Sequence, residues 1–294
     1  MVIGLLGLGE VGTAYGLGMV RNGATIKGYD IRFENPKDMP LFDRCKAGGI
    51  TLAKTPQECI EGCDLIMANT TSHVAVRTAE MAKPFLKPGQ IYIDGNSAIP
   101  TVKHEIAALL DGCCDFVDGV TMNNPTQLGL KCPVTVSGPM AAKATEILAG
   151  YGMTMVNIGD QIGQASALKC IRSVFTKSFI SSFMECMIMA HKYGISDPMF
   201  ESIVSYLTDD PPRETLETIA VTHVLHAWRQ GEEVESVSVF EKEEGIDNTM
   251  AAAAAKKLYY NGSLGMREKF NDRVAPNMKA VLDEMLKAYL QKKA

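Results

Sequence analysis

The segment Gly7-Leu8-Gly9-Glu10-Val11-Gly12 constrains the fold of this chain more than any other part of the sequence. It follows a short apolar run, Val2–Leu6, and precedes an amphipathic helical pattern. A second apolar run, Thr25–Tyr29, ends in Asp30, which follows the glycines by about 20 residues, as a dinucleotide-binding fingerprint requires. Strand, G-x-G-x-x-G turn, helix and acid-terminated strand together predict a β–α–β unit that binds a dinucleotide.

Each part of this unit has a physical reason. Gly7 permits a tight turn, Gly9 lets the backbone approach a pyrophosphate, and Gly12 allows close packing of helix and strand. Asp30 can accept hydrogen bonds from the adenosine ribose and repel a 2′-phosphate, which favours NAD, whereas Arg32 can serve the 2′-phosphate of NADP. The alternative is an ordinary βα turn without a ligand. We therefore expect NAD or NADP, with NAD favoured, bound by Gly7, Leu8, Gly9, Glu10, Val11, Gly12, Asp30, Ile31 and Arg32.

Strand-like and helical segments alternate through the first 160 residues. This alternation predicts an α/β fold with a Rossmann-type, doubly wound parallel sheet. Ligands of such sheets bind beyond the carboxyl ends of the strands, so polar residues that follow the strands are candidates for one crevice. Taken singly, each is more readily explained as a turn residue than as a ligand-binding residue. The candidates are Asn69, Thr70, Thr71 and Asn96 for the cofactor, and Ser97, Thr121, Met122 and Asn123 for the substrate.

The alternation stops after Gly159, and a single long helix is predicted from about 163 to 193. Lys169, Arg172 and Ser173 share one face of this helix, at spacings of three and four residues. The helix begins at the edge of the sheet, so its first turns can face the crevice. A lysine on a helix is usually a solvated charge, and spacing alone does not make Lys169 catalytic.

Three ordered motifs in about the first 195 residues carry a family resemblance. The glycine-rich turn is similar to a G-L-G-x-M-G cofactor loop, with Val11 in place of Met. Asp94-Gly95-Asn96-Ser97 is similar to a substrate and cofactor segment, and Gly159-Asp160-Gln161-Ile162-Gly163-Gln164-Ala165-Ser166-Ala167-Leu168-Lys169 to a catalytic-helix signature. These motifs resemble the β-hydroxyacid dehydrogenase family, which includes 6-phosphogluconate and 3-hydroxyisobutyrate dehydrogenases. The resemblance implies that Lys169 is the catalytic lysine and that Arg172 and Ser173 lie at the substrate.

The same resemblance implies the domain organisation. We expect a dinucleotide-binding domain at 1–160 and an all-α substrate and dimerisation domain at 161–294, linked by the helix at about 163–193. The compact helical C-terminal part resembles a separate 6-phosphogluconate dehydrogenase-like branch, because the larger C-terminal domain and the Lys-x-x-His-Asn pattern of 6-phosphogluconate dehydrogenase itself are absent. Two positions depart from the family pattern: Ser173 replaces an Asn, and Asp118–Asn124 replaces a D-x-P-V-S-G-G substrate loop.

These observations predict an NAD(P)-dependent dehydrogenase or reductase that acts on CH–OH groups. It transfers a hydride between the nicotinamide and a small, acidic hydroxy or oxo substrate, with Lys169 as general acid/base. The departures leave two alternatives open: imine reduction on the same scaffold, and a non-catalytic NAD(P)-sensing protein. Imine reductases of this fold usually lack the lysine, which counts against the first.

Composition bears on partners and location. The formal net charge of −5 argues against a nucleic-acid-binding surface, and no apolar stretch approaches the ~18 residues of a membrane span. Eight scattered cysteines without a Cys-x-x-Cys pair, and the lack of a signal-peptide pattern, favour the reducing cytoplasm. We expect a small-molecule substrate, no nucleic acid or membrane partner, a homodimer, and no metal, since His223 and His226 have no further ligands nearby in sequence.

Overall fold

The computed structural model describes residues 1–292, so the last two residues of the predicted helical domain lie outside it. Contacts divide the chain into two compact units, residues 1–174 (unit 1) and residues 175 onward (unit 2). The sequence placed a boundary at 160–161, before the long helix. The structure divides the chain farther along, within that helix, because the first turns of the helix are hydrogen-bonded to the sheet through Asp118 and Ser137.

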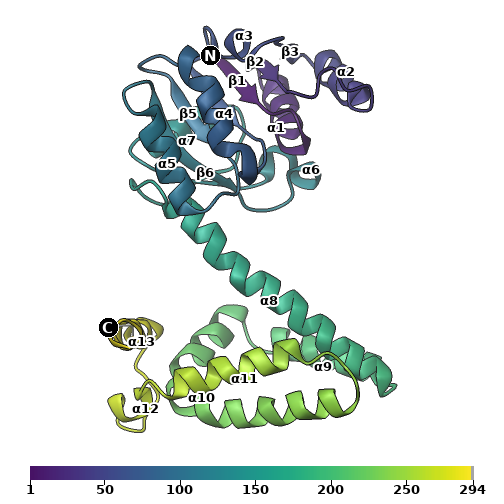
Figure 1. Cartoon of the computed structure of the whole chain (residues 1–294), viewed down its shortest axis with the longest axis vertical. Coiled ribbons are helices and arrows are strands. Elements are labelled where there is room, and N and C mark those ends of the chain that lie inside the picture. The colour runs from purple at the N-terminus through teal and green to yellow at the C-terminus, as the bar shows by residue number, and fades with distance from the viewer. Residues whose placement is uncertain (293–294) are drawn as a thin grey trace. The chain divides into compact units, whose positions relative to one another are not determined.

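Unit 1 contains one eight-stranded sheet in the order β3-β2-β1-β4-β5-β6-β7-β8 (Figure 1). All neighbouring strands are parallel except β6 and β7, which are antiparallel. The predicted Rossmann-type sheet is confirmed, except that β7 and β8 run opposite to the other six strands. The strands are β1 Val2–Leu6, β2 Thr25–Tyr29, β3 Thr51–Leu52, β4 Leu65–Ala68, β5 Ile91–Asp94, β6 Asp115–Thr121, β7 Val134–Ser137 and β8 Met155–Asn157.

Helices cover both faces of this sheet, as a doubly wound fold requires. One buried cluster joins the sheet to α1, α2 and α7, and a second joins the opposite face to α3, α4 and α5. Thr55 caps α3 by accepting a hydrogen bond from the backbone N–H of Glu58 at 3.2 Å. The helices are α1 Glu10–Arg21, α2 Met39–Ala47, α3 Pro56–Ile60, α4 Ala75–Ala82, α5 Pro100–Leu110, α6 Pro125–Leu128 and α7 Ala141–Ala149, with 3₁₀ turns at Ser72–Val74, Lys83–Phe85 and Gly129–Lys131.

The long helix α8, Gln164–Lys192, begins in unit 1 and continues into unit 2. Unit 2 is otherwise built from α9 Ser196–Thr208, α10 Pro212–Glu243, α11 Thr249–Gly262, α12 Met266–Lys269 and α13 Met278–Gln291. Its buried apolar cluster includes Val224, Leu264 and Val281. The predicted all-helical C-terminal region is therefore confirmed. Within residues 1–292, no helix has both the length and the apolar character of a membrane span.

Candidate active site

The glycine-rich turn has the geometry that its sequence predicted. Gly7 adopts φ +97°, which favours glycine, and an added Cβ at Gly12 would lie only 2.0 Å from the carbonyl oxygen of Gly7. By contrast, a Cβ at Gly9 would meet no atom closer than the Arg32 guanidinium, at 3.8 Å. Gly9 caps the N-terminus of α1, so the turn leaves open space at a helix end that favours an anion. Glu10 and Val11 form the first turn of α1, where Glu10 is exposed.

Asp30 follows β2 and is only 7% exposed. One carboxylate oxygen accepts a hydrogen bond from the backbone N–H of Leu8 at 2.9 Å, and the other pairs with Nε of Arg32 at 3.0 Å. Burial raises the pKa of Asp30, but the hydrogen bonds from Arg32 and Leu8 outweigh it, so this pKa lies below its ordinary value. Arg32 also pairs with Asp38 at 3.1 Å, and Ile31, which lies between Asp30 and Arg32 in the sequence, is exposed. Asp30 therefore stabilises the glycine-rich turn, a role that the sequence did not predict.

Asn69, after β4, carries buried polar atoms that fit a bound dinucleotide. Its side-chain nitrogen and oxygen are both buried and have no hydrogen-bond partner among the described residues. Buried amides without a partner are rare, and a ligand is one way to satisfy them. The amide lies against Gly95, where an added Cβ would stand 2.6 Å from its oxygen. Nearby, Thr70 donates a hydrogen bond to the side-chain oxygen of Asn96 at 3.3 Å, and Thr71 precedes the 3₁₀ turn at Ser72–Val74.

Lys169 meets the carboxyl ends of two neighbouring strands. Its Nζ donates hydrogen bonds to the hydroxyl of Ser97, after β5, and to the carbonyl oxygen of Thr121, at the end of β6. The side chain is half-buried, and its pKa lies below the ordinary value, first because of burial and then because of the nearby charges of Lys103 and Arg172. The structure thus places three of the predicted catalytic and substrate residues together.

Arg172 and Ser173 lie one helical turn beyond. The Arg172 guanidinium donates to the carbonyl oxygen of Met122 at 3.2 Å and to the side-chain oxygen of Asn123 at 3.5 Å. Arg172 therefore binds the end of the Asp118–Asn124 segment, which departs from the family pattern. Ser173 donates its hydroxyl to the carbonyl oxygen of Lys169 at 2.8 Å, within the helix.

A buried lysine beneath this site was missed by the sequence analysis. Lys103 on α5 is fully buried and pairs with Asp94 at 3.0 Å and with Asp118 at 3.4 Å. Burial raises the pKa of Asp94, although Lys103 and the hydrogen bonds from Asn96 oppose this effect. The available signal was spacing, because Lys103 shares the buried face of α5 with Ile106 and Leu110. A lysine in an apolar stripe needs a partner.

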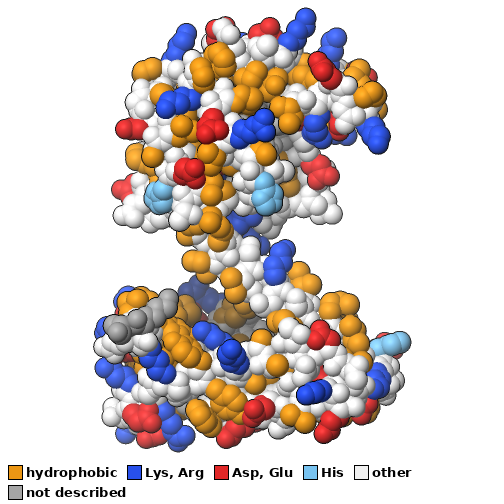
Figure 2. Space-filling view, in the orientation of Figure 1, with side chains coloured by type: hydrophobic (Ala, Val, Ile, Leu, Met, Phe, Trp, Pro, Cys, Tyr) orange, Lys and Arg blue, Asp and Glu red, His pale blue; other side chains and the backbone are white. Residues whose placement is uncertain are grey.

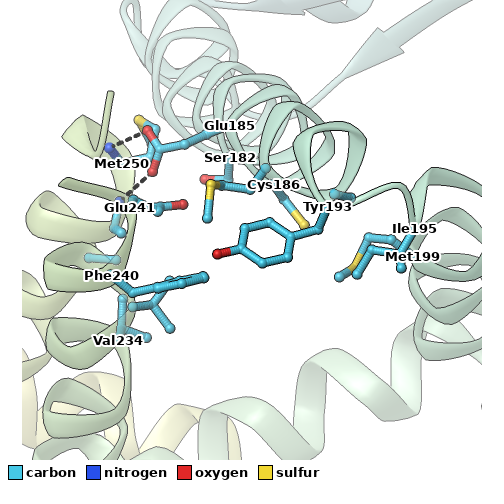
Figure 3. Close-up of a pocket in the computed structure, with 15 residues that line it drawn as sticks. Ser182, Glu185, Cys186, Tyr193, Ile195, Met199, Val234, Phe240, Glu241 and Met250 are labelled. Carbon is cyan, nitrogen blue, oxygen red and sulfur yellow. Dashed lines mark hydrogen bonds between the residues drawn. The ribbon is translucent and has the colours of Figure 1, made fainter. Parts of the chain in front are cut away.

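Unit 2 contains an apolar cavity of about 470 Å³ between α8, α10 and the start of α11 (Figure 3). Glu185 accepts hydrogen bonds from the backbone N–H groups of Met250 and Ala251, both at 2.8 Å, and thereby caps α11. Glu241 is buried beside it, and burial together with Glu185 raises the pKa of Glu241. Among the described residues no cluster of three or more potential ligands could hold a metal.

The strand–turn–helix geometry, the open face of Gly9 and the unpartnered Asn69 amide define unit 1 as a Rossmann-type NAD(P)-binding domain. Residues 2–119 match the family model of the NAD-binding domain of 6-phosphogluconate dehydrogenase, and this part of the chain is a domain of that type. Residues 190–259 match a domain of unknown function, DUF1932. The predicted family resemblance and the predicted cofactor class, NAD or NADP, are thus confirmed.

The chain is also similar to whole proteins. It is 27% identical over 243 residues, covering 82% of this chain and 90% of the relative, to an uncharacterised 28.5 kDa protein of Methanothermus fervidus. The conserved protein MTH1747, described as structurally similar to 3-hydroxyacid dehydrogenases, is 23% identical with a TM-score of 0.60, covering 90% of this chain and 99% of that one. An imine reductase from Myxococcus stipitatus in complex with NADP⁺ is 17% identical with a TM-score of 0.68, covering 97% and 99%; a variant of it was solved with NAD⁺. The chain thus has the fold of these solved structures.

Proposed function

We propose that the chain is an NAD(P)-dependent oxidoreductase that moves a hydride between the nicotinamide and a small, acidic hydroxy or oxo substrate. Lys169 serves as its general acid/base. The observation that carries this proposal is the half-buried Lys169 amine, bound to Ser97 and Thr121 at the carboxyl ends of β5 and β6. Ligands of doubly wound sheets bind at that edge.

The residues around Lys169 suit a proton-transfer role. The bound cofactor supplies or accepts the hydride, and the protein orients the substrate and handles one proton. A neutral Lys169 amine takes the proton of a hydroxyl in oxidation, and the ammonium returns it to a carbonyl oxygen in reduction. The lowered pKa of Lys169 brings this exchange closer to neutral pH. Arg172 has five N–H donors, so it can hold an acid group of the substrate while it also binds the loop at Met122 and Asn123.

The preference for NAD is supported by Asp30. Its lowered pKa keeps the carboxylate charged at neutral pH, and this charge disfavours a 2′-phosphate. Arg32 would be the cation to attract that phosphate, but it is already paired with Asp30 and Asp38. We expect tighter binding of NADH than of NADPH, measured by fluorescence titration.

The experiment is a hydride-transfer screen, followed in nicotinamide absorbance, over 2- and 3-hydroxyacids, their oxo forms and a set of cyclic imines. We expect turnover with a hydroxy or oxo acid, and loss of that turnover in Lys169→Ala with unchanged NADH affinity. Lys143→Ala, which alters an exposed lysine on α7, is the matched control and should behave as wild type. Full turnover in Lys169→Ala would refute the assignment of the lysine.

The same screen separates two other functions. Imine reduction is suggested by the likeness to the Myxococcus stipitatus enzyme over 97% of this chain. Turnover of imines alone would favour it over the proposed function. Tight binding of NADH without turnover of any compound would instead favour an NAD(P)-sensing protein.

We further propose a cytoplasmic homodimer. Figure 2 shows hydrophobic side chains at the surface along α8, where Phe175 is 63% exposed and Phe179 is 45% exposed. A second copy would cover such a surface, since large exposed apolar patches mark interaction sites. None of the eight cysteines forms a disulfide, which suits a reducing compartment. Sedimentation equilibrium should give twice the chain mass, and Phe179→Glu should shift it toward the monomer.

A further inference from the structure

Lys103, near Lys169, connects the neighbouring strands β5 and β6. It is fully buried, and its Nζ lies 2.8 Å from the carbonyl oxygen of Asp94 and 2.9 Å from that of Gly119. The same nitrogen pairs with the Asp94 carboxylate at 3.0 Å and the Asp118 carboxylate at 3.4 Å. A well-packed apolar side chain would fill this space without the desolvation cost of a buried ion cluster. The cost of burying Lys103, Asp94 and Asp118 together therefore suggests that the cluster has a functional role.

The Asp118 carboxylate connects Lys103 to the helix that carries Lys169. Its second oxygen accepts hydrogen bonds from the backbone N–H of Gly163 at 3.1 Å, and from the backbone N–H and hydroxyl of Ser166 at 3.0 and 2.9 Å. Ser166 precedes Lys169 by three residues, which is about one helical turn. The first turn of α8 is thus bound to β6 through one oxygen of the Asp118 carboxylate, and the other oxygen pairs with Lys103.

The other ligands of Lys103 fix the two partners of the Lys169 amine. Asp94 accepts hydrogen bonds from the backbone N–H of Asn96, at 3.2 Å, and from its side-chain nitrogen. This arrangement sets the turn that contains Ser97. Gly119 lies two residues before Thr121 on β6. The turn that contains Ser97 is therefore fixed through Asp94, and the part of β6 that leads to Thr121 is held through the Gly119 carbonyl oxygen; both residues bind Lys103.

We propose that Lys103 is a positioning residue for Lys169, whose ammonium holds the Asp94 and Asp118 carboxylates so that Ser97, Thr121 and the first turn of α8 present the Lys169 amine to the crevice. This inference rests on the proposed function, in which Lys169 transfers the proton. It assigns Lys103 no contact with substrate or cofactor.

The same arrangement has an electrostatic consequence. The charged and titratable groups that act on Lys169 are Lys103 from α5, Arg172 and Cys170 from α8, and Cys132 before β7. The two cations lower the pKa of Lys169, in addition to the larger effect of burial, whereas the two thiols raise it. Lys103 is the first of these cations, so removing its charge should raise the pKa of Lys169.

The test measures the Lys169 titration directly. Reductive methylation with ¹³C-formaldehyde labels accessible lysines of the full chain, and Lys169→Arg identifies the Lys169 signal in the NMR spectrum. In Lys103→Met we expect its titration midpoint to move up, the pH profile of kcat/KM to move in the same direction, and kcat to fall on the order of 10- to 100-fold. In Lys143→Ala none of these three quantities should change. A folded Lys103→Met with the wild-type titration curve and pH profile would overturn the proposal.

A second variant covers the case in which Lys103→Met does not fold. Ser166→Ala removes one hydrogen bond to Asp118 and keeps the Lys103 charge, so kcat should fall while the titration midpoint stays nearly constant. An unchanged kcat in Ser166→Ala would refute the positioning link. If no compound is turned over, the NMR titration still decides: a shifted midpoint in Lys103→Met supports the role of Lys103 while the proposed function fails.

Discussion

Alanine substitutions in the glycine-rich turn should distinguish its role in folding, at Gly12, from its role in cofactor binding, at Gly9. In Gly12→Ala the new Cβ would lie 2.0 Å from the Gly7 carbonyl oxygen, whereas ordinary contact begins at 3.4 Å, so backbone atoms must separate by 3.4 − 2.0 = 1.4 Å. Overpacking of this kind costs about 3 kcal/mol. For a unit of this size, we expect the melting temperature to fall by about 6–12 °C.

Gly9→Ala should do the opposite. Its backbone, at φ −71°, accepts any residue, and the added Cβ meets nothing within 3.8 Å. Stability should therefore stay the same or rise by about 0.4–1 kcal/mol through the loss of unfolded-state entropy. The methyl group would instead occupy the space of the cofactor pyrophosphate. We expect NADH binding about 10- to 100-fold weaker, which corresponds to about 1.4–2.8 kcal/mol.

The assay pairs thermal unfolding, followed by circular dichroism, with fluorescence titration of NADH on both variants. Gly12→Ala reports on the fold, and Gly9→Ala reports on the ligand. Wild-type NADH affinity in Gly9→Ala would show that the pyrophosphate does not pack against this glycine. Unfolding of Gly9→Ala at the temperature of Gly12→Ala would refute the reasoning from open space.

Three further predictions address the acid/base, the cofactor preference and a helix cap. In oxidation, kcat/KM should rise with pH and level off above the lowered pKa of Lys169, because the neutral amine is the base. In reduction, kcat/KM should fall over the same pH range. In Lys169→Arg, pH–rate profiles should show neither the rise in oxidation nor the fall in reduction. Asp30→Asn removes the charge that opposes a 2′-phosphate and frees Arg32 from its ion pair with Asp30. The ratio of NADPH affinity to NADH affinity should therefore rise about tenfold, or about 1.4 kcal/mol. An unchanged ratio in paired titrations would count against this role of Asp30. Thr55→Ala should lower the free energy of unfolding by about 1 kcal/mol in urea, and Thr55→Ser should not.

Local signals determined how much of the fold could be predicted. The bounds of β1 and β2 follow from apolar runs that end at a glycine and at Asp30. The long helix was predicted to within a residue at either end, because Gly163 and Gly194 flank it and both adopt positive φ. The helix α5 was missed, since Lys103 interrupts its apolar stripe. The reversal of β7 was also missed, because strand direction depends on pairing with distant residues.

In the candidate site, too, residues marked by local motifs could be predicted and long-range contacts could not. Gly7, Asp30, Ser97, Thr121 and Lys169 stand at strand ends or in motifs, so sequence was enough to nominate them. Sequence could not show that Asp30 also binds the N–H of Leu8, or that Lys103 supports the groups around Lys169. Both are tertiary contacts between residues that no short motif connects.

The reversed strand β7 determines what forms the wall of the crevice. Because β6 and β7 are antiparallel, residues 122–133 leave and re-enter the sheet at one edge, the edge where Lys169 binds Thr121. This segment packs on α1, with Leu130 filling the space over Gly18. It belongs to no crossover between parallel strands, so insertions or replacements there disturb no pairing register. Substitutions in this segment therefore change the wall beside Lys169 without changing the register of any parallel strand pair.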